Sequence, residues 1–177
     1  MAMPRLNLPT VLTLSRIVLI PFFIFIMPGH PVLASLIFLI AAATDFLDGY
    51  LARLYGQVTT FGTILDPIAD KFLVITALIL LVDQGILSAW IAILIIVREF
   101  FVTALRVVAL AKNIVIKAEM GGKLKTATQI TAIVFLIIRD SFFGIDLYDS
   151  GMLLIIISLI LAVTSAVQYT INFWKKI

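Results

Sequence analysis

Long apolar runs, broken at short intervals by turn residues and charges, set the pattern of this chain. Each run holds about 20 residues, the length with which an α-helix crosses a hydrocarbon core about 30 Å thick. The pattern predicts an all-α integral membrane protein with six transmembrane helices after a short interfacial segment, Leu6–Thr13. The expected helices are Thr10–Met27, Val32–Leu54, Thr63–Val82, Leu87–Ala111, Leu124–Phe143 and Met152–Trp174.

Turn residues and polar segments separate these helices. Pro28-Gly29-His30-Pro31 and Asp83-Gln84-Gly85 are turns, and His30 is read as a turn residue. Tyr55–Thr63 is expected to be a loop, Lys112–Lys125 a basic connection, and Arg139–Gly151 a turn region with net negative charge. The chain contains no repeat or linker, so we expect a single domain over residues 1–177.

The composition supports a bilayer protein and excludes several kinds of site. Apolar residues make up 63% of the 177 residues and charged residues 13%, far from the balance of soluble domains. There is no cysteine and one histidine, which excludes disulfides and thiolate sites and argues against zinc. The net charge of +3 is modest, so no nucleic acid is expected as a partner.

The basic residues predict the orientation in the membrane, because cytoplasmic loops are enriched in Lys and Arg. In a six-helix arrangement the opposite side carries Arg139 alone. Both termini are therefore expected in the cytoplasm, on the side that collects Arg5, Arg53, Lys71, Lys112, Lys117, Lys123, Lys125, Lys175 and Lys176.

Four of the ten acidic residues lie in one stretch, on two consecutive helices of the expected set. Asp45 and Asp48 are three residues apart and Asp66 and Asp70 four apart, so each pair shares a helical face. Carboxylates within a bilayer need a compensating partner, and oxygen ligands favour Mg²⁺ or Mn²⁺. Two such ions would suit phosphoryl transfer by neutralising a pyrophosphate and stabilising a departing phosphate oxygen.

Small residues follow the first aspartate pair. Gly49 and Ala52 leave that helical face nearly bare, so a flat nucleotide could lie there. Arg53 is placed for a phosphate oxygen, and Gly62 permits close approach of the next helix or of a ligand. A purely structural alternative is that the aspartates cap helix ends and the glycines pack helices.

A second set of charges lies in the fourth and fifth expected helices. Arg98 falls in mid-helix, where it must line a wet cavity or meet an anion. Together with Arg106, Lys123 and Lys125 it is a candidate for a phosphate pocket beside the metal ions. In the alternative, Arg98 merely pairs with a neighbouring helix and the lysines extend their charged ends to the membrane surface.

The pattern D-x-x-D-G-x-x-A-R, eight residues, then G-x-x-x-D-x-x-x-D resembles the signature of the CDP-alcohol phosphotransferases, and every position is present. The resemblance implies a six-helix membrane enzyme, usually a homodimer, with a metal-bound CDP-lipid between the second and third helices. It implies that Asp70 is also the general base. It further implies metal ligation by Asp45, Asp48, Asp66 and Asp70, and CDP binding by Asp45, Asp48, Gly49, Ala52, Arg53 and Gly62.

The stretches LNLPTVLTLSRIVLIPFF, REFFVTALR and GGKLKTATQ are similar to the phosphatidylglycerophosphate synthase branch of that family. The implied reaction transfers a phosphatidyl group from CDP-diacylglycerol to sn-glycerol 3-phosphate and releases CMP, in phospholipid biosynthesis at the cytoplasmic face of a bacterial inner membrane. The acceptor phosphate would contact Arg98, Arg106, Lys123 and Lys125, with Asn7, Thr10 and Arg16 as further candidates.

Two other functions remain open from the sequence. A CDP-dependent cardiolipin synthase would use phosphatidylglycerol, another phosphate-bearing alcohol, as acceptor. A small cation transporter would use intramembrane aspartates as its ion site. The transporter predicts acids near mid-membrane, whereas these lie toward one face, and it gives no reason for Ala52-Arg53.

Overall fold

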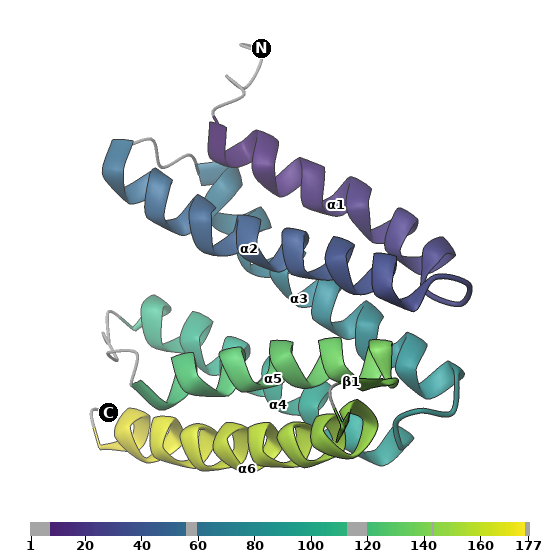
Figure 1. Cartoon of the computed structure of the whole chain (residues 1–177). Helices are drawn as coiled ribbons and strands as arrows, with labels where there is room; N and C mark the ends of the chain where they lie inside the picture. Colours follow the sequence, from purple (N-terminus) through teal and green to yellow (C-terminus); the bar gives the residue numbers. More distant parts are fainter. Residues whose placement is uncertain (1–7, 56–59, 113–119, 143, 176–177) are drawn as a thin grey trace. The chain divides into compact units, whose positions relative to one another are not determined.

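The computed structural model describes residues 8–55, 60–112, 120–142 and 144–175. These residues form six α-helices and one short β-hairpin (Figure 1). The chain divides into two compact units, Met1–Leu80 and Leu81–Ile177, which are described separately below. The prediction of a mostly helical protein is confirmed.

The first unit contains α1 (Leu8–Ile26), α2 (Pro31–Tyr55) and most of α3 (Thr60–Asp83). Helices α1 and α2 pack against each other, joined by the turn that was expected around Pro28. The rings of Phe23 and Phe38 are both fully buried, with their centroids 5.9 Å apart. The backbone N–H of His30 donates to the carbonyl of Ile26 at 2.9 Å, so His30 belongs to this turn, as predicted.

The second unit contains the end of α3, then α4 (Ala89–Ala111), α5 (Met120–Ile138) and α6 (Leu147–Trp174). Helix α6 packs against both α5 and α4 (Figure 1). Apolar side chains from these three helices form the core, and its members include Ile95, Ile133, Leu136, Ile137, Ile155 and Ala162.

A hairpin between α5 and α6 corrects two expected helix ends. Strands β1 (Ser141–Phe142) and β2 (Ile145–Asp146) pair antiparallel, with Ser141 opposite Asp146. Helix α5 therefore ends at Ile138 and not at Phe143, and Arg139 turns the chain with a φ of 47°.

Helix α6 begins at Leu147 and not at Met152, because Asp146 caps its N-terminus. The Asp146 carboxylate accepts hydrogen bonds from the backbone N–H groups of Tyr148, at 2.8 Å, and Asp149, at 3.2 Å. A side chain that satisfies two otherwise unpaired N–H groups stabilises the start of a helix at this point.

Two other boundaries differ from the expected ones. Helix α3 begins at Thr60, within the segment Tyr55–Thr63 that was expected to be a loop. Helix α5 begins at Met120, so Lys123 and Lys125 lie inside its first turns and not in a basic connection before it.

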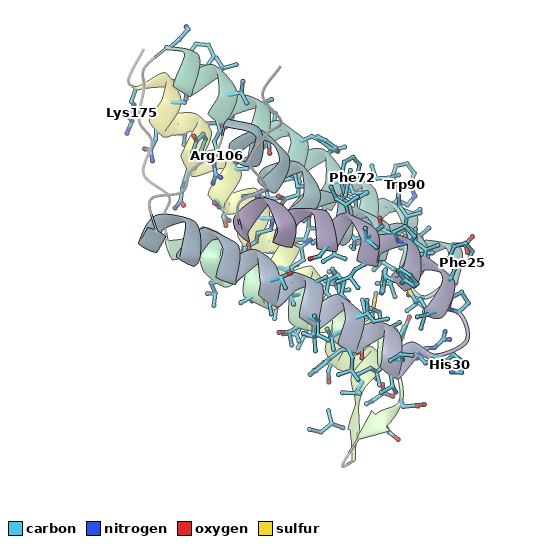
Figure 2. All side chains as sticks on the ribbon, turned by 90° about the horizontal axis from the view of Figure 1, so that it is seen from above. Phe25, His30, Phe72, Trp90, Arg106 and Lys175 are labelled. Atoms are coloured by element: carbon cyan, nitrogen blue, oxygen red, sulfur yellow. The ribbon has the colours of Figure 1, made fainter. Side chains whose placement is uncertain are left out.

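The outer surfaces of the helices are strongly apolar. Phe25 and Trp90 are 84% and 76% exposed, and both project away from the ribbon (Figure 2). Within the described ranges, α6 is the one helix long and apolar enough to cross a membrane, and shorter apolar helical stretches occur at Ile17–Ile26, Pro31–Thr44 and Leu124–Ile138. These features are consistent with an all-α membrane protein.

Candidate active site

The four aspartates of the sequence motif lie on two helices of the first unit. Asp45 and Asp48 are in α2, and Asp66 and Asp70 are in α3, so the expected helical setting of both pairs is present. At 3.6 residues per turn, each pair occupies successive turns on one side of its helix. The side chains of residues 45–55 and 60–70 lie outside the part that the structure describes, so contacts between them stay a prediction.

The donor set of this motif fits a hard divalent cation. It consists of four carboxylates with no thiol or imidazole, which is the chemistry that Mg²⁺ and Mn²⁺ prefer. The small and basic residues of the motif lie on the same two helices as the aspartates: Gly49, Ala52 and Arg53 are on α2, and Gly62 is on α3. Among the side chains that are described, no group of three or more acidic, histidine or cysteine residues is placed to hold a metal ion.

A charged cluster lies among the three helices of the second unit. Nη1 of Arg98 donates to Oε1 of Glu99 at 3.0 Å, and Nζ of Lys125 donates to the same carboxylate oxygen. Nε of Arg98 donates in addition to the backbone carbonyl of Ala162 on α6, at 2.7 Å. We call Arg98, Glu99 and Lys125 the α4–α5 charge cluster, since it joins these two helices and is anchored on α6.

The α4–α5 charge cluster is largely withdrawn from solvent. Lys125 is 5% exposed, and the side chains of Arg98 and Glu99 are 11% and 19% exposed. Two cations removed from water repel each other, and the carboxylate between them offsets that cost. These three side chains together carry one excess positive charge.

These contacts bear on both interpretations of Arg98 and the lysines, and binding of the acceptor phosphate stays a prediction. Arg98 does meet an anion, Glu99, and it also bonds a neighbouring helix through Ala162. Lys125 is buried and paired, so it does not extend its charge to the membrane surface as the alternative required.

Other predicted acceptor residues are not part of this cluster. The guanidinium carbon of Arg106 lies 5.9 Å from the ring centroid of Tyr169, a cation–π contact between α4 and α6. The side chains of Lys123, Thr10 and Arg16, and Asn7 as a whole, lie outside the described residues. Their roles stay predictions.

Sequence reasoning missed two residues of this region, Glu99 and Gln129. Glu99 is an acid within an apolar helix, directly after the arginine that was singled out, and that position was the available signal. Gln129 follows Lys125 by four residues on α5 and is 3% exposed. Its amide Nε2 is buried and has no hydrogen-bond partner among the described atoms.

Comparison with known proteins agrees with the motif. The family described as CDP-alcohol phosphatidyltransferase matches residues 6–166 of this chain. A protein of Bacillus subtilis (strain 168) named CDP-diacylglycerol–glycerol-3-phosphate 3-phosphatidyltransferase is 38% identical, and the alignment covers 97% of each chain. Proteins with the same name from Escherichia coli (strain K12) and Haemophilus influenzae are each 40% identical, over 93% of this chain and 93% and 92% of theirs. With a complete aspartate motif on two consecutive helices and these matches over nearly its whole length, the chain belongs to the CDP-alcohol phosphatidyltransferase family.

Proposed function

We propose that this protein transfers the phosphatidyl group of CDP-diacylglycerol to sn-glycerol 3-phosphate, giving phosphatidylglycerophosphate and CMP. One observation carries the proposal: relatives named for this reaction are 38–40% identical over more than nine-tenths of the chain. The complete motif from Asp45 to Asp70 supports the donor half of the reaction, and the α4–α5 charge cluster supports a phosphate-bearing acceptor.

The chemistry is a displacement at phosphorus. A hydroxyl oxygen of the acceptor forms a bond to the phosphorus that carries diacylglycerol. The bond from that phosphorus to the bridging oxygen breaks, and CMP departs with the electron pair. Asp70 accepts the hydroxyl proton, because a neutral alcohol is a poor nucleophile without a base within hydrogen-bond reach.

Asp45, Asp48, Asp66 and Asp70 are proposed to hold divalent metal ions, Mg²⁺ or Mn²⁺ and two in number. Such ions, when bound, neutralise the pyrophosphate and the charge that develops on the leaving phosphate. Gly49 and Ala52 on α2, and Gly62 on α3, leave room for the cytidine and its diphosphate. Arg53, at the end of α2, is proposed to contact a phosphate oxygen.

The acceptor phosphate is proposed to contact Arg98 and Lys125, with Arg106 and Lys123 as further cations. A guanidinium offers several N–H donors in a fixed plane, and the hydrogen bonds named above use two of the five on Arg98. The cluster's excess positive charge supports a phosphate ester over a neutral alcohol such as free glycerol.

The setting is proposed to be the inner membrane of a bacterium, with six transmembrane helices, both termini in the cytoplasm and the active site facing the cytoplasm. The excess of Lys and Arg on one side of that arrangement supports the orientation. The enzyme is proposed to act as a homodimer, as the family resemblance implies, on a lipid substrate that stays in the bilayer.

An acceptor competition tests the function. Purified protein in detergent is given CDP-diacylglycerol and, in parallel, glycerol 3-phosphate, inositol phosphate, serine or phosphatidylglycerol, while CMP release and lipid products are followed. We expect CMP release and a phosphatidylglycerophosphate product with glycerol 3-phosphate alone, abolished by a chelator and restored by Mg²⁺ or Mn²⁺. A cardiolipin product from phosphatidylglycerol would instead identify a cardiolipin synthase, and no CMP release with any acceptor would contradict the proposal.

A further inference from the structure

We infer that Glu99 is a positioning residue for the acceptor phosphate: it holds Arg98 of α4 and Lys125 of α5 at a fixed separation so that both can contact one phosphate group. The inference rests on the proposed function, since it concerns the same acceptor. It assigns a role to a carboxylate that the aspartate motif does not include.

The shared oxygen is the geometric basis. Oε1 of Glu99 accepts from Nη1 of Arg98 and from Nζ of Lys125, so one atom sets the distance between two cations on different helices. Arg98 cannot swing away freely, because its Nε is bonded to the carbonyl of Ala162 on α6. Lys125 is a flexible side chain with a single terminal nitrogen, and its bond to Glu99 restrains that nitrogen.

Charge gives a second reason for a carboxylate at this point. Without Glu99, two buried cations would repel and would separate or draw in a counterion. With Glu99 present, the three side chains keep one net positive charge, and this charge attracts a phosphate group.

Gln129 supplies an independent sign that a polar ligand comes to this face of α5. It lies one helical turn beyond Lys125, where residues four apart are neighbours on one face. Gln129 is 3% exposed, and its Nε2 has no partner among the described atoms. A buried N–H donor without a partner is unfavourable, and an acceptor oxygen of a ligand would satisfy it.

The test compares Glu99→Gln with the wild-type enzyme. The substitution keeps the size of the side chain and an accepting oxygen but removes the charge that holds the two cations together. We expect the KM for glycerol 3-phosphate to rise about tenfold, with kcat and the KM for CDP-diacylglycerol changing less than about threefold. Asp140→Asn, an exposed acid of the same unit, is the matched control and is expected to leave all three parameters unchanged.

A merely structural role predicts a different pattern. An unchanged KM for glycerol 3-phosphate, an equal rise in both KM values, or a fall in kcat alone would each overturn the inference. If Glu99→Gln does not fold, Glu99→Asp replaces it, because the shorter acid keeps the charge but moves the oxygen. Glu99→Asp is then expected to raise the KM for glycerol 3-phosphate selectively, and an unchanged value would overturn the inference.

The wild-type enzyme separates this inference from the proposed function. If it releases no CMP with glycerol 3-phosphate, the proposed function fails before any variant is measured. If it uses phosphatidylglycerol instead, the Glu99 inference is judged on the KM for that acceptor, which also carries a phosphate. A selective rise would support it, and an unchanged KM would overturn it.

Discussion

Gly151 of α6 lies against Leu136 of α5 so closely that a Cβ atom on Gly151 would be 2.9 Å from Cγ of Leu136. The same atom would be 3.1 Å from the backbone nitrogen of Leu136, which cannot move aside without displacing the helix. Glycine at position 151 therefore permits the close packing of α5 on α6, the two helices that carry Lys125 and the Arg98 anchor Ala162.

Replacing this glycine is expected to destabilise the second unit. Gly151→Val should lower the free energy of unfolding by about 1–3 kcal/mol, the usual cost of overpacking a core. The measurement is thermal unfolding of the detergent-solubilised protein. Gly29→Val is the control, because no atom lies within 4 Å of a Cβ at Gly29. Equal melting temperatures for the two variants would show that α5 and α6 are not so close.

The start of α6 makes a second prediction, which concerns Asp146. Asp146→Ala removes the acceptor for the N–H groups of Tyr148 and Asp149 and should cost about 0.5–2 kcal/mol of stability. Asp146→Asn keeps a side-chain oxygen at the cap and should be nearly neutral. Thermal unfolding distinguishes the two, and a loss of stability equal in both variants would argue that the charge, and not the cap, matters.

Gln129 gives a third prediction, because its buried amide nitrogen Nε2 has no hydrogen-bond partner among the described atoms. Gln129→Leu removes a polar group whose burial costs about 1–3 kcal/mol, so the apoprotein should melt at the same or a higher temperature. Added glycerol 3-phosphate should stabilise the variant less than the wild-type protein. Gln168→Leu, at an exposed position of α6, is the control. A strong loss of stability in Gln129→Leu would show that the amide is already paired.

Asp70 gives the fourth prediction. Asp70→Asn keeps an oxygen ligand but cannot accept a proton, so turnover should fall at least about 100-fold, the contribution typical of a general base. CMP release at saturating Mg²⁺ measures turnover, and equilibrium binding of CDP-diacylglycerol should be retained. Asp83→Asn, at the exposed last residue of the same helix, should behave as wild type. Near-normal turnover in Asp70→Asn would remove this residue from the base role.

The helices could be predicted from the sequence because each apolar run is long and its breaks are marked. The segment from Arg139 to Leu147, where α5 ends and α6 begins, could not be predicted, because its structure depends on local backbone geometry. Arg139 adopts a positive φ, which side-chain-bearing residues rarely do, so its turn carries no strong signal. Asp146 is one of several acids in that segment, and its role as the cap depends on the backbone geometry that the hairpin imposes.

The candidate site was predictable to a similar degree. The spacing of the aspartates is local to α2 and α3, and the structure places both pairs in helices as expected. The need of Arg98 for an anion followed from its depth in an apolar helix. That Glu99 is this anion could not be predicted. Adjacent residues such as Arg98 and Glu99 point in different directions on a helix and meet only when longer-range contacts orient both. Lys125 and Ala162 provide those contacts.

The burial of Lys125 has a consequence for its chemical reactivity. Acylating reagents that attack amines need access to the nitrogen, and Lys125 is 5% exposed, whereas Lys112 and Lys175 are exposed. Brief treatment should therefore acylate Lys112 and Lys175 and spare Lys125, as peptide mass spectrometry would show. Labelling at Lys125 would then report the moments when the packing of α4, α5 and α6 loosens, and protection by an added phosphate ester would support the proposed contact between Lys125 and the acceptor phosphate.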